Sequence, residues 1–264
     1  MNPFTSRARV RRLLLTFFLL LGGVALPGMT LASSPANAAG PHYYVLIGGT
    51  CDGNATVYNG LDLRGGVPLV VSYPAGGVGL PNCNQTPMDQ SWEIGRQNAR
   101  QVILDHWDPT ARYTLVGYSL GAIVVNKVLA DLVDGRLPLD RSRFDAKMYG
   151  DPMAPVGPPG RGVGAVIPAG WGVPSPFLGY VSPGAGRTSY PGIPFVRYCI
   201  DTDGVCDFDD IQGPGGYFAQ HWCYRWVRPS DGRSIMGDTI ADGFYNNGPV
   251  AIGKQDCWGG PIKP

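Results

Sequence analysis

The segment GYSLG at residues 117–121 constrains this chain more than any other part of its sequence. The run before it, YTLV, consists of strand formers, and the run after it, AIVVNKVLADL, places apolar side chains at helical spacing. A strand, a sharp turn and a helix form the setting of a nucleophile elbow, whose strained serine needs small neighbours such as Gly117 and Gly121. We therefore predict that the Ser119 hydroxyl stands clear of a sheet, before a helix N-terminus that favours developing negative charge. A plain strand-to-helix turn is the alternative, because G-x-S-x-G alone is a weak signal in a chain with 39 glycines.

Residues 1–38 have the three parts of a secretory signal peptide. Arginines at positions 7, 9, 11 and 12 are followed by an apolar stretch at 13–26 and by the A-x-A cleavage site Ala36-Asn37-Ala38. We expect cleavage to leave residues 39–264 as one domain, located outside the cell or in the cell envelope. A membrane anchor is the alternative, but the apolar stretch is shorter than the ~20 residues of a spanning helix. We therefore expect no stable membrane span after cleavage.

The composition excludes some classes of protein. The formal net charge is +1 and no basic stripe is present, so nucleic-acid binding has no electrostatic support. Glycine (39) and proline (25) are abundant while hydrophobic residues make up an ordinary 44% of the chain, which indicates many ordered turns and loops instead of disorder.

All six cysteines lie in the predicted mature chain, and an even number in an exported protein indicates three disulfides. Six cysteines allow fifteen pairings. We expect the sequential pairing, in which the second bond closes a short loop: Cys51–Cys83, Cys199–Cys206 and Cys223–Cys257. Zinc binding is a poor alternative because no CxxC or HxxxH spacing occurs.

The remaining pattern predicts strands that alternate with helices. Short apolar runs predict strands at 43–47, 67–73, 113–116, 146–149 and 194–200. A helix is expected to begin at Ser91 and end near Trp107, and the helix after the elbow is expected to be capped by Gly135. This alternation predicts an α/β fold with a mainly parallel sheet.

Residues 152–194 have a different character. Proline and glycine dominate, aromatic residues are interleaved, and no helical period is present. We interpret this segment as a long ordered loop, which is either a lid or acyl-binding wall beside the serine or a loop that only packs on the surface.

A nucleophilic serine needs a base, and the chain has three histidines. After an elbow of this kind the chain order is serine, then acid, then histidine. Only His221 follows Ser119, whereas His42 and His106 precede it. We interpret His106 as structural because it lies near a helix end. A core histidine beside aromatic residues is the alternative for His221.

The acid is expected in the segment CIDTDGVCD at 199–207, because a disulfide-closed loop after a strand would hold a carboxylate rigidly. Asp203 lies near the apex of this loop and is the first choice, followed by Asp201 and then by Asp151. A calcium site is another interpretation, although the spacing does not fit an EF-hand loop; it would use Asp201, Asp203, Asp207, Asp209 and Asp210.

An oxyanion hole needs two backbone N–H groups. One is expected from Leu120, the residue after the serine, and the other from the loop after the first strand, where Thr50 is the natural donor.

Three segments resemble the cutinase-like branch of the α/β-hydrolases. They are the turn Gly48-Gly49-Thr50, the elbow with Gly150-Asp151-Pro152 one helix later, and the C-x-x-x-D-x-x-C loop from Cys199 to Cys206 with a histidine downstream. The resemblance covers roughly residues 43–225. It implies a three-layer α/β-hydrolase fold, Asp203 as the catalytic acid, and Thr50 and Leu120 as the oxyanion donors.

The chain also departs from cutinases, which usually carry glutamine where this chain has Leu120. The loop at 152–194 is long, and a disulfide-stapled extension, 223–264, follows the histidine. In these respects the chain is more similar to actinobacterial PE-PPE-type serine hydrolase domains and to phage mycolyl-arabinogalactan esterases, which argues against plant cutin as the substrate.

Together these observations predict a secreted serine esterase that acts on aliphatic, lipid or polyester esters, with cell-envelope lipid among the candidate substrates. No metal or organic cofactor is implied, and we expect a monomer. Two alternatives stay open: a cell-envelope acyltransferase with the same triad, and a non-catalytic envelope-binding protein on a hydrolase scaffold.

Overall fold

The computed structural model describes residues 40–172, 180–209 and 220–257. Residues 39–264 form one compact unit. The predicted signal peptide, residues 1–38, lies outside the described residues.

The core of the unit is a sheet of six parallel strands in the order β2-β1-β3-β4-β5-β6. Strand β3 lies near the middle, and its residues are buried from Tyr113 to Tyr118 because helices and loops cover both faces. The strands are β1 (His42–Ile47), β2 (Val67–Val70), β3 (Arg112–Tyr118), β4 (Phe144–Tyr149), β5 (Phe195–Ile200) and β6 (Gly248–Ile252).

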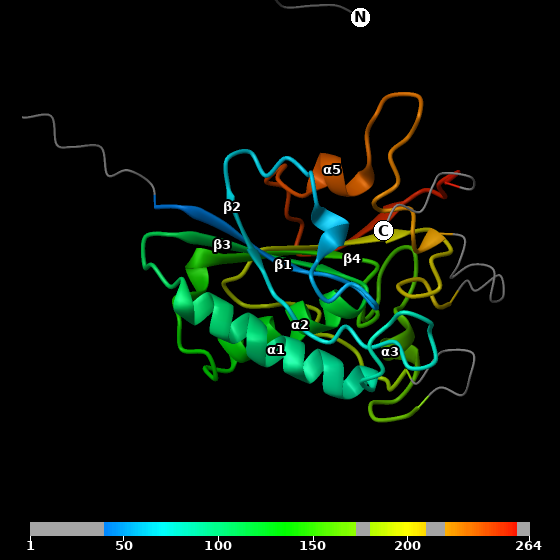
Figure 1. The fold of residues 1–264 in the computed structure, drawn as a ribbon, viewed down its shortest axis with the longest axis horizontal. Helices are drawn as coiled ribbons and strands as arrows, with labels where there is room; N and C mark the ends of the chain where they lie inside the picture. Colours follow the sequence, from blue (N-terminus) through cyan, green and yellow to red (C-terminus); the bar gives the residue numbers. More distant parts are fainter. Residues whose placement is uncertain (1–39, 173–179, 210–219, 258–264) are drawn as a thin grey trace, which may run out of the picture. The chain divides into compact units, whose positions relative to one another are not determined.

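Helices cover the two faces of this sheet. Figure 1 shows α1 (Met88–Asp105), α2 (Leu120–Val133) and α3 (Val163–Val166) on one side and α5 (Ile235–Thr239) on the other. Two short 3₁₀ helices, η1 (Thr56–Tyr58) and η2 (Arg141–Arg143), complete the described helices. The predicted three-layer α/β fold is therefore confirmed.

Alternating strand residues build two separate hydrophobic cores. On β3, Tyr113 and Leu115 pack in the core under α1 and α2, whereas Val116 and Tyr118 pack in the core under α5. No helix among the described residues is long and apolar enough to span a membrane.

Helix α1 begins three residues earlier than the sequence predicts. It begins at Met88, after Pro87, and Ser91 lies inside the helix. The Ser91 hydroxyl is buried and accepts a hydrogen bond from the Gly76 N–H at 2.9 Å. The serine therefore holds the neighbouring loop instead of capping its own helix, which is why the capping pattern was misleading. Gly135, by contrast, follows α2 with a positive φ of 74°, as expected after a helix end.

In its described part, the predicted long loop at 152–194 contains one short helix, α3 (Val163–Val166), which the sequence pattern did not indicate. The four residues VGAV are too few to show a helical period in the sequence. Residues 173–179 lie outside the described part of the chain. The start of the segment packs against the loop after β5, because Val163 N–H donates to Val205 O at 2.9 Å and Phe208 N–H donates to Arg161 O at 2.6 Å.

The described part of the C-terminal extension predicted at 223–264 contributes one helix to a face of the sheet and one strand to the sheet itself. It supplies α5, whose Met236 is fully buried, and the edge strand β6, which pairs with β5. The three disulfides join Cys51 to Cys83, Cys199 to Cys206 and Cys223 to Cys257, which is the sequential pairing.

A buried ion pair fastens the long loop to the sheet. The Nε of Arg197, on β5, donates to Asp151 Oδ2 at 2.7 Å. Asn126 on α2 donates to both oxygens of the same carboxylate, at 3.0 and 3.1 Å, and Met153 N–H donates to it at 2.9 Å. Arg197 also donates to Arg187 O at 2.9 Å. One cluster therefore ties the sheet and α2 to both arms of the loop.

We expect Arg197→Met to lower the free energy of unfolding by about 3–5 kcal/mol, because it leaves the Asp151 carboxylate buried without its ionic partner. The side chains of this pair are 3% and 1% exposed. The matched control is Arg161→Met, which breaks an exposed pair with Asp209 at 44% and 40% exposure. It should cost less than about 1 kcal/mol. Urea unfolding of both variants measures the difference, and equal losses would contradict the role given to Asp151.

Candidate active site

Ser119 lies in a sharp turn between β3 and α2. Its backbone has φ 56° and ψ −120°, a left-handed conformation that is costly for a residue with a side chain. A hydrogen bond from Ser119 N–H to Tyr149 O at 2.9 Å holds the turn against β4. The turn directs the side chain beyond the carboxyl end of the sheet, which is where open parallel sheets bind their ligands.

The two glycines of the GYSLG segment are required by close approach of backbones. A Cβ on Gly121 would lie 2.3 Å from Ile47 O, and a Cβ on Gly117 would lie 2.5 Å from Gly121 O. Gly49, in the loop after β1, is less tightly placed but still close, because its Cβ would lie 2.9 Å from Tyr118 Cδ1 and 3.2 Å from the Ser119 Cβ. The first strand, its loop and the second helix therefore meet directly around the serine.

The structure brings Ser119, His221 and Asp203 together. His221 Nε2 lies 2.8 Å from Ser119 Oγ, and His221 Nδ1 lies 3.0 Å from each oxygen of the Asp203 carboxylate. Asp203 is fully buried, His221 is 1% exposed and Ser119 is 6% exposed. These distances permit proton transfer from the hydroxyl to the imidazole while the carboxylate holds the Nδ1 proton.

Asp203 lies in the loop that the Cys199–Cys206 disulfide closes. Its Oδ1 accepts a hydrogen bond from Val205 N–H at 3.0 Å. Asp207 supports the other side of the loop by accepting from the Thr202 N–H at 2.8 Å, where Thr202 has a positive φ of 65°. The loop is therefore held by backbone donors at two carboxylates and by one covalent link.

Two tyrosines that the sequence analysis did not select contact this group. Tyr118 stacks on the His221 ring at 5.1 Å between centroids, and its hydroxyl donates to His221 O at 2.7 Å. Tyr224 donates to Asp203 Oδ2 at 2.9 Å. Burial, and next the nearby Asp203 charge, raise the pKa of Tyr224 well above its usual value, so its hydroxyl stays protonated and can donate. No pattern in the sequence indicates either contact, because both join segments that are separated along the chain.

Gly150 is the second feature that the sequence analysis did not assign to the site. It has φ 57°, and a Cβ there would lie 2.8 Å from His221 Cε1 and 3.1 Å from Asp203 Oδ2. Glycine is therefore needed after β4 so that the imidazole and the carboxylate can lie against the backbone.

The two expected oxyanion donors lie on either side of the serine. Leu120 is the first residue of α2, and the first N–H groups of a helix have no partner within it. Among the described residues the Thr50 N–H has no hydrogen-bond acceptor, and its peptide is oriented by the bond from Asp52 N–H to Gly49 O at 3.0 Å. The helix N-terminus and the loop after β1 can thus both present N–H groups near Ser119.

The other acids considered from sequence are not brought to His221. Asp151 is held by Arg197 Nε at 2.7 Å, and Asp201 donates its N–H to Ile252 O at 2.8 Å as part of the β5–β6 edge. Of the aspartates considered for calcium, Asp203 contacts His221, Asp207 accepts a hydrogen bond from the Thr202 N–H, and Asp209 pairs with Arg161 at 2.6 Å. Asp210 lies outside the described residues.

The two other histidines lie away from the serine. His42 begins β1, at the opposite end of the sheet, where its Nε2 is 2.8 Å from Thr114 Oγ1. Burial lowers the pKa of His42, although the nearby Asp145 acts in the opposite direction. His106 is the exposed C-cap of α1, with its Nδ1 2.9 Å from Val102 O. Both have structural hydrogen bonds and neither contacts Ser119.

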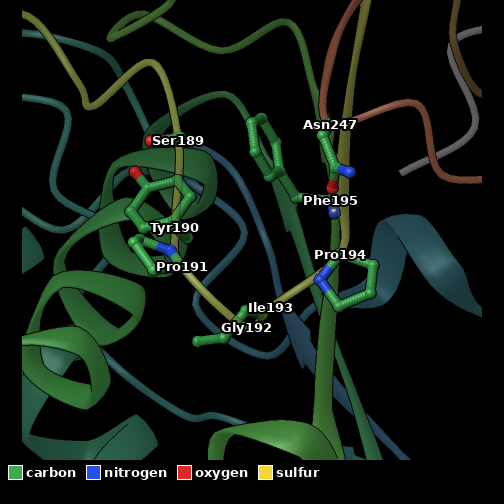
Figure 2. Close-up of a pocket in the computed structure, with 8 residues that line it drawn as sticks. All are labelled: Ser189, Tyr190, Pro191, Gly192, Ile193, Pro194, Phe195 and Asn247. Carbon is green, nitrogen blue, oxygen red and sulfur yellow. Dashed lines mark hydrogen bonds between the residues drawn. The ribbon is translucent and has the colours of Figure 1, made fainter.

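A pocket of about 410 Å³ lies where the chain enters β5. Figure 2 shows Tyr190 and Pro191 on one side of it and Phe195 and Asn247 on the other. Because the sheet is parallel, this pocket lies at its amino end, away from the turn that carries Ser119. We therefore do not associate it with the serine.

The sequence profile of the PE-PPE domain family matches residues 65–213, a stretch that includes Ser119 and Asp203. No curated protein matches the chain.

Several solved structures are similar to the chain, among them the two that follow. A cutinase-like protein from Cryptococcus sp. has 20% identity and a TM-score of 0.48, covering 78% of this chain and 95% of its own. Tomato methylketone synthase I has 14% identity and a TM-score of 0.29, covering 45% and 42%. Both TM-scores lie below 0.5, so the family assignment rests on the sequence profile.

We expect Gly121→Ala to destabilise the folded protein by about 1–3 kcal/mol, because its new methyl group would overlap backbone oxygens of β1 that cannot easily move. A loss of this size lowers the melting temperature by roughly 3–10 °C in a domain of this length. Gly248→Ala is the matched control, because a Cβ there meets open space. Thermal melting followed by circular dichroism measures both, and an unchanged melting temperature for Gly121→Ala would disprove the tight contact.

Proposed function

Because the chain belongs to the PE-PPE domain family, we propose that it is a secreted carboxylester hydrolase that uses Ser119, His221 and Asp203 as its catalytic triad. Membership in this family supports a function as a hydrolase of esters or lipids. The observation that carries the proposal is the continuous hydrogen-bonded path from Ser119 Oγ through the His221 ring to Asp203, with steps of 2.8 and 3.0 Å. A plain strand-to-helix turn would not require such a path between residues 102 positions apart.

In the first half of the proposed reaction, Ser119 Oγ attacks the carbonyl carbon of an ester. His221 Nε2 takes the hydroxyl proton as the new C–O bond forms, and Asp203 stabilises the resulting imidazolium through Nδ1–H. The N–H groups of Leu120 and Thr50 donate hydrogen bonds to the carbonyl oxygen and stabilise the negative charge that develops on it. His221 then returns the proton to the leaving alcohol, and an acyl-serine is left.

In the second half, water attacks the acyl carbon while His221 takes one of its protons. The bond to Ser119 Oγ breaks, the proton returns to this oxygen, and the carboxylic acid leaves. The same two N–H groups serve both halves, because the charge develops on the same oxygen.

The substrate class that we propose is an aliphatic, lipid or polyester ester, with cell-envelope lipid among the candidates. Two tryptophans support an apolar substrate. Trp222, which follows His221, is 45% exposed, and Trp171 in the long loop is 66% exposed. An exposed aromatic ring beside the catalytic histidine would offer apolar surface to the acyl chain of a substrate. Trp222 is the stronger support, since its ring centroid lies 6.3 Å from that of His221.

We propose that the protein acts outside the cytoplasm, as a monomer. Three disulfides are typical of proteins in oxidising compartments, and the predicted signal peptide provides a route there.

We expect Ser119→Ala to lower kcat for p-nitrophenyl ester hydrolysis by roughly 10⁵- to 10⁶-fold, because the nucleophile is removed. The measurement compares acyl chains from acetyl to palmitoyl. A preference for long chains is expected if the substrate is a lipid. Ser189→Ala is the matched control: Ser189 is exposed at the pocket of Figure 2, and its loss should leave kcat unchanged.

The other outcomes of this measurement separate the alternatives. Retained turnover in Ser119→Ala would reject the triad. A folded wild type that reacts with a fluorophosphonate but hydrolyses none of the esters would indicate an acyltransferase, and product analysis with an added alcohol acceptor would identify it. A folded wild type that does not react with the fluorophosphonate would indicate a non-catalytic binding protein.

A further inference from the structure

The Tyr224 hydroxyl joins the end of β5 to the loop that the Cys199–Cys206 disulfide closes, which is called the acid loop below. It accepts a hydrogen bond from Ile200 N–H at 3.0 Å and donates one to Asp203 Oδ2 at 2.9 Å. Tyr224 is fully buried, and its ring lies edge-on to those of Tyr118 and Tyr149 at 6.0 and 6.1 Å. The hydroxyl is therefore held at one position by the packing of its ring and by a backbone donor.

The hydrogen bonds at Asp203 show why this position matters. His221 Nδ1 lies 3.0 Å from both carboxylate oxygens, so the imidazole alone does not fix the twist of the carboxylate about its Cβ–Cγ bond. The twist is set by one further donor on each oxygen: Val205 N–H on Oδ1 and Tyr224 O–H on Oδ2. The first donor belongs to the acid loop itself, whereas the second comes from the segment that carries His221.

We propose that Tyr224 is a positioning residue of this site, which orients the Asp203 carboxylate toward His221 and draws part of its negative charge away from the imidazole. The inference rests on the proposed function, in which Asp203 stabilises the His221 imidazolium. Because all three side chains are buried, no water competes with these hydrogen bonds.

The remaining titratable groups around the pair come from four parts of the fold. Tyr118 faces His221 from β3, Tyr149 faces Tyr224 from β4, and Asp207 supports Thr202 in the acid loop. Burial raises the pKa of Tyr149 well above its usual value, so this group adds no charge. Ser119, from the elbow, is the other partner of the imidazole. Among the described contacts of the His221 side chain, Asp203 is thus the charged partner whose hydrogen bonding Tyr224 can change.

The sign of the effect follows from this arrangement. Removing the Tyr224 hydroxyl leaves more negative charge on Asp203 Oδ2, which stabilises the protonated imidazole and raises the pKa of His221. The imidazole must be neutral to accept the serine proton. As the pH falls, this neutral form is then lost at a higher pH than in the wild type. A carboxylate free to twist also holds the Nδ1–H less well, so turnover falls even where the histidine is neutral.

The test uses the full chain with Tyr224→Phe. Proton NMR follows the imidazole C–H signals of the three histidines against pH, and His221→Gln identifies the relevant one. We expect the His221 pKa in Tyr224→Phe to be higher than in the wild type. The acid limb of the kcat/KM profile should move by the same amount, and the plateau kcat should fall about tenfold with KM unchanged, as expected for the loss of one charge-assisted hydrogen bond.

Tyr113→Phe is the matched control. The Tyr113 hydroxyl is also bound by a backbone donor, Asp108 N–H at 2.7 Å, and donates to His106 O at 2.6 Å, but it lies at the opposite end of β3. This control loses the same number of hydrogen bonds and should leave the His221 pKa and kcat unchanged. A purely structural role for Tyr224 predicts the same result for both variants.

A second variant covers the case in which Tyr224→Phe does not fold. Replacing Tyr224 by 3-fluorotyrosine keeps the ring and strengthens the donor, so the His221 pKa should fall. An unchanged His221 pKa in whichever of the two variants folds would overturn the inference. The NMR result does not need turnover: a shifted pKa in a protein without esterase activity would support the role of Tyr224 in the Asp203–His221 pair while rejecting ester hydrolysis.

Discussion

The strained backbone of Ser119 is the constraint on which the rest of the site depends. A residue with a side chain can hold φ 56° here only because neighbouring backbones approach at Gly49, Gly117 and Gly121 without clashing. These contacts join β1, β3 and α2 into one rigid corner. The remaining parts of the site come to this corner on loops, each of which is fastened to the sheet: the acid loop by its disulfide and by β6, and His221 by the hydroxyl of Tyr118.

Most of the fold could be predicted from the sequence because its signals are local. Five of the six strands and the two long helices lie at apolar runs that could be recognised in the sequence. Strands β3, β4 and β5 are buried on both faces as expected, whereas β2, at the edge of the sheet, ends at Val70 instead of Tyr73 and buries only Leu69 of its four residues. Strand β6 could not be predicted. Its residues GPVAI contain a proline, and it forms because β5 offers an unpaired edge. The start of α1 was misjudged for a similar reason, since Ser91 bonds to a distant loop instead of its own helix.

The candidate site divides in the same way. Ser119, Asp203 and His221 could be selected because the elbow and the cysteine-closed loop are local patterns with a required chain order. Tyr118, Gly150 and Tyr224 could not be selected as contacts. Their importance comes from packing between segments up to 103 positions apart, and an aromatic or glycine residue in isolation does not indicate what it will contact. Sequence patterns thus identify the reacting groups, and the surrounding groups that hold them become visible only in three dimensions.

The order of these segments along the chain has a consequence for synthesis. β1, β3 and α2 all precede Asp134 in the chain, so the segments that meet around Ser119 are made before the other parts of the site. The imidazole partner follows 102 residues after the serine, and the strand that braces the acid loop through Ile252 follows later still. During synthesis the Ser119 hydroxyl therefore has no imidazole partner and no braced carboxylate until the rest of the sheet has been made. Under the proposed function, the esters of the producing cell are not exposed to a working enzyme during translation.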